Sequence, residues 1–316
     1  MALLQNKGIQ NEQYSVGKMT ALLFRIVLLF SVSPLVYAES PVLLPDTLQM
    51  TGPAIAYQPR EYVPTDEASV LSDEQIIADL QLLAGVGFRS LVTYSATDEM
   101  AKIPGIARKE GFDETIIMGI WDPFSSDEWR NAVKNAPFVD GYCIGNEGLG
   151  IRYTPQELAV KMEELRRLTG KPVTTSEPID SYISGHHKEW LLKHSDWLFP
   201  IAHPYWANYE DPAKGVAWVV AYHDLLVVLA NRQVMLKEVG HPTVFPVGFN
   251  ENRQTEFFQL LDSHRISFFF FEAFDQPWKG NTVEERRVEA YWGIFRADGT
   301  PKKVVPWITK NEMSRE

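Results

Sequence analysis

The chain has 316 residues, of which 45% are hydrophobic and 12% aromatic, and its formal net charge is -11. This composition supports one large hydrophobic core and argues against a disordered chain. It also argues against nucleic acid and anionic membrane surfaces as partners, because both require clusters of Lys and Arg that this sequence lacks.

The N-terminal segment differs in kind from the rest. An apolar run at 21–30 follows basic residues and leads to a small-residue site at 36–38. This order is typical of a secretory signal peptide, which predicts cleavage after residue 38 and export to the periplasm or the extracellular space. An uncleaved membrane anchor is the alternative, and we disfavour it because Arg25 and Pro34 interrupt the apolar run. After cleavage, no stable membrane association is expected.

Strand-like and helical segments then alternate along residues 54–305, between a leader at 39–53 and a C-terminal tail at 306–316. The predicted strands are 54–57, 89–94, 116–121, 139–145, 172–176, 196–203, 234–238 and 267–274. The predicted helices are 72–83, 100–111, 126–134, 155–168, 188–194, 213–230 and 252–264, with an irregular segment after the last strand. Eight such units predict an α/β protein with a single-domain (β/α)8 TIM barrel. An open doubly wound sheet is the rival, but no G-x-G-x-x-G or Walker loop follows the first strand.

Two predicted strands end in a glutamate with a glycine close behind it. Glu147 ends the fourth strand and Glu238 ends the seventh. Active groups of TIM barrels come from the C-terminal ends of several strands, so both carboxylates are expected at one site. Two carboxyls about 5–5.5 Å apart suit a retaining glycosidase, in which one protonates the leaving oxygen while the other attacks the anomeric carbon. Mutual repulsion helps to separate their pKa values.

Other polar and aromatic residues at strand ends are candidate substrate-binding groups. The Asn146 amide could bond a sugar 2-hydroxyl, or it could be a turn residue. Glu177 is read as a sugar-hydroxyl acceptor or a partner of Arg or Lys, and Tyr205 as a group that reaches the nucleophile. Aromatic rings suited to stacking on sugars recur at strand exits, although each ring alone is more often core. They are Tyr57, Tyr94, Trp121, Tyr205, Trp206 and Trp278.

Other chemistries have weak signals. Cys143 is the only cysteine, which excludes an internal disulfide, and on an apolar strand it reads as a small buried hydrophobe. His186, His187 and His194 lack an H-E-x-x-H pattern, so we expect no metal site. No G-x-S-x-G elbow indicates a serine nucleophile, and no cofactor is expected.

Several motifs together resemble glycoside hydrolase family 17, the β-1,3-glucanases and glucan transglycosylases of a barrel clan. The similarity runs over about residues 55–302, and the motifs are Gly145-Asn146-Glu147, Glu238-Val239-Gly240-His241-Pro242, Phe271-Glu272-Ala273-Phe274-Asp275-Gln276-Pro277-Trp278-Lys279, Trp292-Gly293-Ile294-Phe295 and Asp298-Gly299-Thr300-Pro301-Lys302. The resemblance implies Glu147 as acid/base and Glu238 as nucleophile. It also implies Glu272 and Lys279 as supporting polar residues near the substrate.

The sequence departs from the family pattern at two positions. His241 stands where the family usually has Trp, which is expected to alter a sugar subsite, and Gln276 replaces a common acid. The leading hypothesis is therefore a retaining enzyme acting on β-1,3-glucan. Hydrolysis and transglycosylation share the glycosyl-enzyme intermediate and stay open. A non-catalytic glucan-binding barrel and a barrel enzyme of unrelated chemistry are the alternatives, and the oligomeric state is left open.

Overall fold

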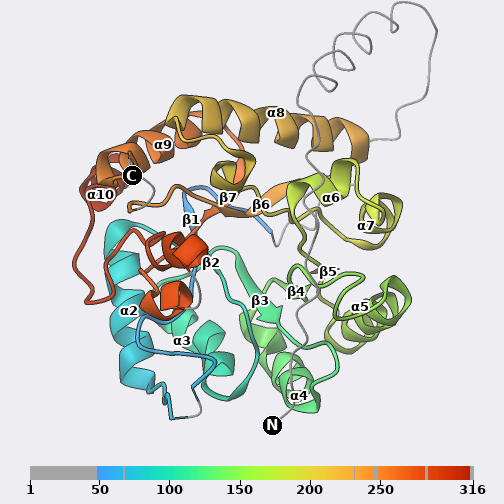
Figure 1. Cartoon of the computed structure of the whole chain (residues 1–316). Helices are drawn as coiled ribbons and strands as arrows, with labels where there is room; N and C mark the ends of the chain where they lie inside the picture. The colour runs from blue at the N-terminus through green and yellow to red at the C-terminus, as the bar shows by residue number, and fades with distance from the viewer. Residues whose placement is uncertain (1–47, 67, 231, 245–247, 282–283, 314–316) are drawn as a thin grey trace, which may run out of the picture. The chain divides into compact units, whose positions relative to one another are not determined.

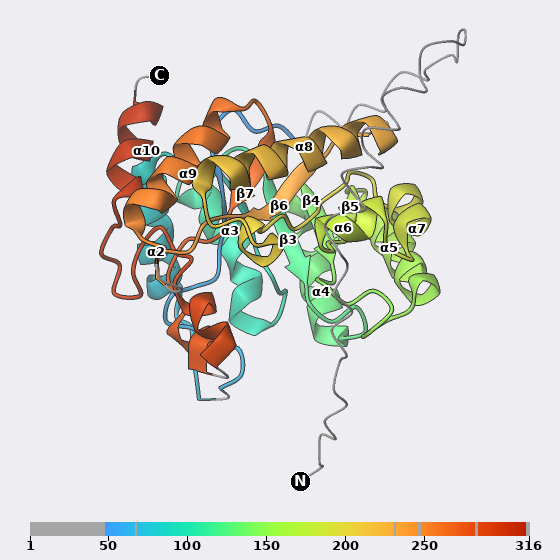
Figure 2. The ribbon, with the colours of Figure 1, turned by 45° about the horizontal axis from the view of Figure 1, so that its top comes forward.

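The computed structural model describes residues 48–313, except for positions 67, 231, 245–247 and 282–283. The predicted signal peptide at 1–38 lies outside the described residues. Those that are described belong to one compact unit, in which helices surround a sheet (Figures 1 and 2).

Seven parallel strands form one sheet in the order β5-β4-β3-β2-β1-β7-β6. They are β1 (Ala54–Ala56), β2 (Ser90–Val92), β3 (Ile116–Ile120), β4 (Gly141–Ile144), β5 (Val173–Thr174), β6 (Met235–Val239) and β7 (Ser267–Phe270). Each strand is followed by one or more helices before the next strand begins, as parallel pairing requires.

The segment 196–203 closes the sheet into a ring between β5 and β6. Ile201 bridges Pro178 on one side and Glu238 on the other, and both bridges are parallel. Pro200 has no N–H and interrupts a regular ladder, which explains why the predicted sixth strand consists of isolated bridges. The prediction of a (β/α)8 TIM barrel is confirmed, and β6 and β7 occupy its seventh and eighth positions.

Helices and short 3-10 turns surround this ring (Figure 1). The α-helices are α2 (Asp73–Val86), α3 (Ile103–Lys109), α4 (Ser126–Asn135), α5 (Pro155–Thr169), α6 (Ile179–Ile183), α7 (Lys188–His194), α8 (Pro212–Ala230), α9 (Glu251–Ser263) and α10 (Val304–Glu312). The 3-10 turns are η2 (Asp98–Lys102), η3 (Ala136–Phe138), η4 (Pro204–Ala207), η5 (Pro277–Asn281) and η6 (Glu284–Ala290). Ser72 and Gln75 form a capping box at the start of α2, and Pro155 occupies the first turn of α5.

The C-terminal end corrects one expectation. Residues 304–312, predicted as irregular chain and tail, form α10, which packs against both α2 and α9 and completes the ring of helices. Its buried face is short, with Val304, Val305 and Ile308, and Pro306 stands in its first turn. A proline is tolerated there because the first N–H groups of a helix have no intrahelical acceptor.

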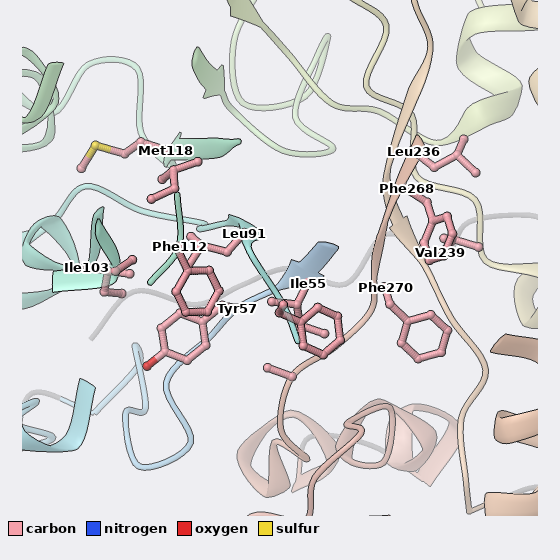
Figure 3. Packing of buried hydrophobic residues seen from close by; sticks show 14 of the residues in the cluster. Ile55, Tyr57, Leu91, Ile103, Phe112, Met118, Leu236, Val239, Phe268 and Phe270 are labelled. Carbon is pink, nitrogen blue, oxygen red and sulfur yellow. The ribbon is translucent and has the colours of Figure 1, made fainter. Parts of the chain in front are cut away.

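Side chains alternate between the inside of the ring and the layer between strands and helices. Ile55, Leu91 and Met118 point into the outer layer and pack there with helical residues such as Ile103 (Figure 3). The inner cluster contains Ala54, Ala56, Val92, Ile117, Cys143, Trp197, Phe199, Met235, Phe269 and Trp292. Cys143 is therefore the small buried hydrophobe that was predicted, and burial raises the pKa of its thiol to about 11.

Part of the predicted leader belongs to the core of the barrel. Leu48, in the predicted leader, is buried in the inner cluster, and the neighbouring Gln49 carbonyl accepts a hydrogen bond of 2.8 Å from Thr115 Oγ1.

Among the described helices, α8 is the one long and apolar enough to cross a membrane by length and composition, and 28% of its apolar stretch is buried.

Candidate active site

Glu147 stands in a tight turn directly after β4. The backbone φ angles are 74° at Gly145 and 49° at Glu147, in the left-handed region that glycine adopts most easily. A Cβ atom on Gly145 would lie 2.0 Å from the Tyr153 hydroxyl, so a larger residue does not fit. The Glu147 N–H donates to the Ser176 carbonyl at 2.9 Å. A non-glycine residue held in this conformation is uncommon and typical of functional sites.

Glu177 holds the same turn from the end of β5. Its Oε1 accepts hydrogen bonds from the N–H groups of Gly148 at 3.0 Å and Leu149 at 2.8 Å. Its side chain is buried, and burial raises its pKa to about 7, although the two N–H groups oppose this. The structure thus gives Glu177 a role in fixing the loop of Glu147. The charge of Arg152 also lowers the pKa of Glu177, in line with the predicted Arg partner, and the contact with a sugar hydroxyl stays a prediction.

Glu238 lies near the end of β6 and is 5% exposed. Burial by itself would raise the pKa of this carboxyl, but two neighbours outweigh burial and hold it at about 2. Lys237 Nζ lies 3.1 Å from Oε1 of Glu238, and His203 Nε2 lies 3.3 Å from Oε2. Glu238 is therefore an anion over the whole ordinary pH range.

The pKa of Glu147 is shifted in the opposite direction, above its ordinary value. Its side chain is open to solvent, yet loss of water around the carboxyl raises its pKa, and the negative charge of Glu238 raises it further. His203 and Lys237 oppose this rise. The two predicted catalytic carboxyls thus interact with each other and have pKa values shifted in opposite directions, as an acid and a nucleophile require.

His203 and Lys237 are contacts of Glu238 that the sequence reasoning missed. Tyr205 was expected to reach this carboxylate, but it is His203 that does so, while Tyr205 packs edge-on against Trp206 and Trp292. A histidine at the exit of the sixth barrel position was a usable signal, because that exit opens on the same side as both glutamates. Lys237 had no such signal.

Two of the predicted binding residues join this group. The Tyr94 ring centroid lies 4.7 Å from Lys237 Nζ, and burial and the charges of Glu238 and Glu272 raise the pKa of its hydroxyl well above the ordinary value. Asn146 Oδ1 accepts a hydrogen bond from Lys237 Nζ. Both side chains therefore lie beside the carboxylates.

The remaining aromatic candidates differ in exposure. Trp121 is 46% exposed and has the Arg152 guanidinium 4.4 Å from its ring centroid, while Trp206 is 50% exposed. Trp278 is partly buried. Tyr57 is fully buried and donates a hydrogen bond of 3.1 Å to Asp79, so the structure does not support its predicted contact with a sugar.

Glu272 and Lys279 form an ion pair after β7, in which the glutamate is buried and the lysine is partly buried. Lys279 Nζ lies 2.7 Å from Oε2 of Glu272, whose side chain has no exposed surface. Burial raises the pKa of Glu272 to about 7, and Lys279 opposes this rise. Glu272 also raises the pKa of Tyr94, so the pair borders the same group of residues.

The two departures from the family pattern are packing features in this structure. His241 is buried between Phe249 and Phe257, and its ring nitrogens lie near backbone carbonyls. The expectation that it alters a sugar subsite is therefore not supported. Gln276 donates to the Gln58 carbonyl at 3.1 Å and accepts a hydrogen bond of 2.8 Å from Trp278, so it fixes that ring.

No metal-binding group is found in the part of the chain that the structure describes, where three or more His, Cys, Asp or Glu side chains would have to gather. Of the three histidines weighed for this role, His194 stacks on Trp190 with ring centroids 4.9 Å apart.

Comparison with known proteins agrees with this geometry. Residues 54–293 match the BtgE/BtgC glycoside hydrolase domain. A glucan 1,3-beta-glucosidase from Arthroderma benhamiae is 24% identical over 242 residues, which cover 66% of this chain and 77% of that protein. A glucan 1,3-beta-glucosidase from Saccharomyces cerevisiae is 23% identical over 249 residues, covering 66% and 78%.

Solved structures show the same fold. The glycoside hydrolase family 17 beta-1,3-glucanosyltransferase from Rhizomucor miehei is 20% identical, with a TM-score of 0.66 over 80% of this chain and 96% of that one. An endo-laminarinase from Formosa Hel1_33_131 is 18% identical, with a TM-score of 0.67 over 83% and 87%.

Proposed function

The chain belongs to the BtgE/BtgC glycoside hydrolase family, and on that premise we propose that it is a retaining enzyme that cleaves β-1,3-glucan, with Glu147 as acid/base and Glu238 as nucleophile. The observation that carries the proposal is the pair of interacting carboxyls whose pKa values are shifted in opposite directions. The substrate follows from the relatives named as glucan 1,3-beta-glucosidases and from the resemblance of the motifs to family 17.

The first step is glycosylation of the enzyme. An oxygen of Glu238 attacks the anomeric carbon and forms an ester bond, while the glycosidic bond breaks and Glu147 gives its proton to the leaving sugar oxygen. Glu238 is suited to attack because Lys237 and His203 keep it ionised. Glu147 is suited to donate because loss of water and the charge of Glu238 raise its pKa.

The second step reverses the role of Glu147. Once Glu238 is esterified, its negative charge is gone, so one cause of the raised pKa of Glu147 disappears. Glu147 is then the carboxylate that accepts a proton from the attacking oxygen, and the ester bond breaks. The attacking group is water in hydrolysis and a sugar hydroxyl in transglycosylation, and both outcomes remain part of the proposal.

The substrate is proposed to lie across exposed aromatic rings at the exits of the barrel positions. Trp121 and Trp206 each present about half of their surface, as rings that stack on sugars must. Tyr94, Asn146 and Trp278 are proposed to complete the binding surface. We also propose that the enzyme is exported, since the sequence before residue 39 has the order of a signal peptide.

Laminari-oligosaccharides of defined length test the activity. Shorter products indicate hydrolysis, longer products indicate transfer, and binding without any product favours the alternative of a glucan-binding barrel. Glu147→Gln and Glu238→Gln should each abolish turnover while leaving substrate binding measurable by calorimetry. Full activity in either variant contradicts the corresponding assignment.

Rescue by azide separates the two roles. The substrate is an aryl β-laminaribioside with a good leaving group. Glu238→Ala should convert it to the α-glycosyl azide, because azide replaces the missing nucleophile. Glu147→Ala should yield the β-glycosyl azide, because azide attacks the glycosyl-enzyme ester that forms without an acid when the leaving group is good. Exchange of the two stereochemical outcomes would exchange the assignments.

A further inference from the structure

An irregularity in β6 places two successive side chains on the same side of the sheet. Neighbouring residues of a regular strand point to opposite faces. In β6 the pairing with β7 shifts its register between Leu236 and Val239, which is the signature of a bulge. As a result, Lys237 and Glu238 both reach the site, and Lys237 Nζ lies 3.1 Å from Oε1 of Glu238.

The Lys237 ammonium is enclosed by partners. The residue is 1% exposed, which is rare for a lysine unless its charge is paired. Besides Glu238, its Nζ donates to Asn146 Oδ1 and lies 4.7 Å from the centroid of the Tyr94 ring. These contacts connect the end of β2, the turn of the acid/base after β4 and the nucleophile on β6.

The contact with Asn146 fixes which way its amide faces. An ammonium has donors only, so the amide atom that meets it must be the carbonyl oxygen. The NH2 group of Asn146 is then the part left to donate a hydrogen bond to a sugar hydroxyl. A freely turning amide could instead offer either group.

Other charged groups around Glu238 do not replace Lys237. Among the described residues that interact electrostatically with Glu238, Glu147 and Glu272 are acids, while Tyr94 carries a hydroxyl and Cys143 a thiol. His203 carries a positive charge only when it is protonated. Lys237 is therefore the ammonium that offsets the cost of burying this carboxylate.

We propose that Lys237 is a positioning residue for the glycosidase reaction, which keeps Glu238 ionised for attack and orients the Asn146 amide as a donor to the substrate. This inference rests on the proposed role of Glu238 as nucleophile. Any adjacent ammonium lowers the pKa of Glu238, so the distinction from a purely structural ion pair lies in the reaction: only a pair that serves catalysis sets the acid limb of the kcat/KM profile.

The test measures the titration of Glu238 directly, without substrate. Carbon-13 NMR of the glutamate carboxyls, with Glu238→Gln used for assignment, should give a midpoint far below the ordinary 4.3 in the wild type. Lys237→Met should raise this midpoint by about 1 to 3 pH units, the usual effect of removing an adjacent opposite charge. Lys237→Gln serves as a second neutral variant if Met does not fold, and Lys237→Arg should keep the midpoint low.

Lys302→Met is the matched control. Lys302 is also a buried lysine paired with a carboxylate, at 2.6 Å from Asp275, so its loss perturbs folding in a similar way. It should leave the Glu238 midpoint in place. The pH midpoint of the acid limb of the kcat/KM profile should behave in the same way and increase only in Lys237→Met and Lys237→Gln.

Three results are decisive. A folded Lys237→Met or Lys237→Gln protein with an unchanged Glu238 midpoint overturns the inference, and so does a wild-type midpoint at or above 4.3, which needs no variant. A wild type that cleaves no β-1,3-glucan, but whose Glu238 midpoint still rises in Lys237→Met, would refute the proposed function while leaving the electrostatic role of Lys237 supported.

Discussion

Removal of the Glu177 side chain should damage catalysis through the loop that holds Glu147, the proposed acid/base. In the wild type, one oxygen of Glu177 accepts hydrogen bonds from two backbone N–H groups, those of Gly148 and Leu149. A buried donor that loses its acceptor costs about 1–3 kcal/mol, so Glu177→Ala puts about 2–6 kcal/mol against the native turn. The turn relieves this cost by moving, and Glu147 moves with it. A misplacement of about 1 Å can lower the rate about 100-fold.

Glu177→Gln provides the comparison. Because a single oxygen accepts both bonds, the Gln carbonyl oxygen can take its place, so this variant should keep kcat within about tenfold of the wild type. Glu177→Ala should lose about 100-fold or more in kcat. The assay is steady-state cleavage of a laminari-oligosaccharide, together with thermal unfolding of each variant.

The ratio of the two effects separates the structural role from the predicted sugar contact. If Glu177 bound a sugar hydroxyl, both variants would mainly raise KM. A folded Glu177→Ala protein with kcat within about threefold of the wild type would refute the reasoning that this side chain positions Glu147.

Three further predictions concern pH, binding and the turn before Glu147. Burial raises the pKa of Glu272 to about 7 in the folded state. Between pH 4.5 and 7 the folded state therefore binds more protons than the unfolded state, so the contribution of Glu272 to the free energy of unfolding is complete below pH 4.5 and is lost as the pH rises to 7. Glu272→Gln should flatten the curve of thermal midpoint against pH in that window, and parallel curves would contradict this. Trp121→Ala should weaken oligosaccharide binding about 2- to 10-fold in calorimetry with little change in thermal midpoint, because the ring is 46% exposed; unchanged affinity would remove it from the binding surface. Gly145→Ala should lower kcat/KM at least about 100-fold because its Cβ would collide with Tyr153, whereas Gly170→Ala, at a φ of 68° with no atom within 4 Å, should only lower stability; equal effects on activity would show that strain alone is responsible.

The barrel and the two carboxylates could be predicted from the sequence because both depend on local patterns. Apolar runs at regular intervals predict the strands, and a glutamate that follows such a run lies at the C-terminal end of its strand. Glu147 and Glu238 therefore had to meet once the ring closed. The structure agrees with this and adds the electrostatic coupling between them.

The features that were missed depend on departures from regular geometry or on contacts distant in sequence. Lys237 and Glu238 are neighbours, and neighbours in a regular strand point to opposite faces, so only the bulge allows both to reach the site. Glu177 resembles other acids at strand ends, and nothing in its own segment shows that it accepts hydrogen bonds from a turn 28 residues earlier. Tyr57 ends a strand like the other aromatic candidates, but its partner Asp79 belongs to α2, and that contact buries it.

Leu48 has a consequence for where the folded domain begins. Its side chain is 2% exposed and belongs to the same inner cluster as Trp197 and Phe199, so the segment before β1 is part of the core inside the ring of strands. A chain shortened to start at β1 would leave a void there, and voids in protein interiors lower stability in proportion to their size. Proteolytic processing that spares residue 48 preserves this core side chain, whereas trimming beyond it would leave the inner cluster of the barrel incomplete.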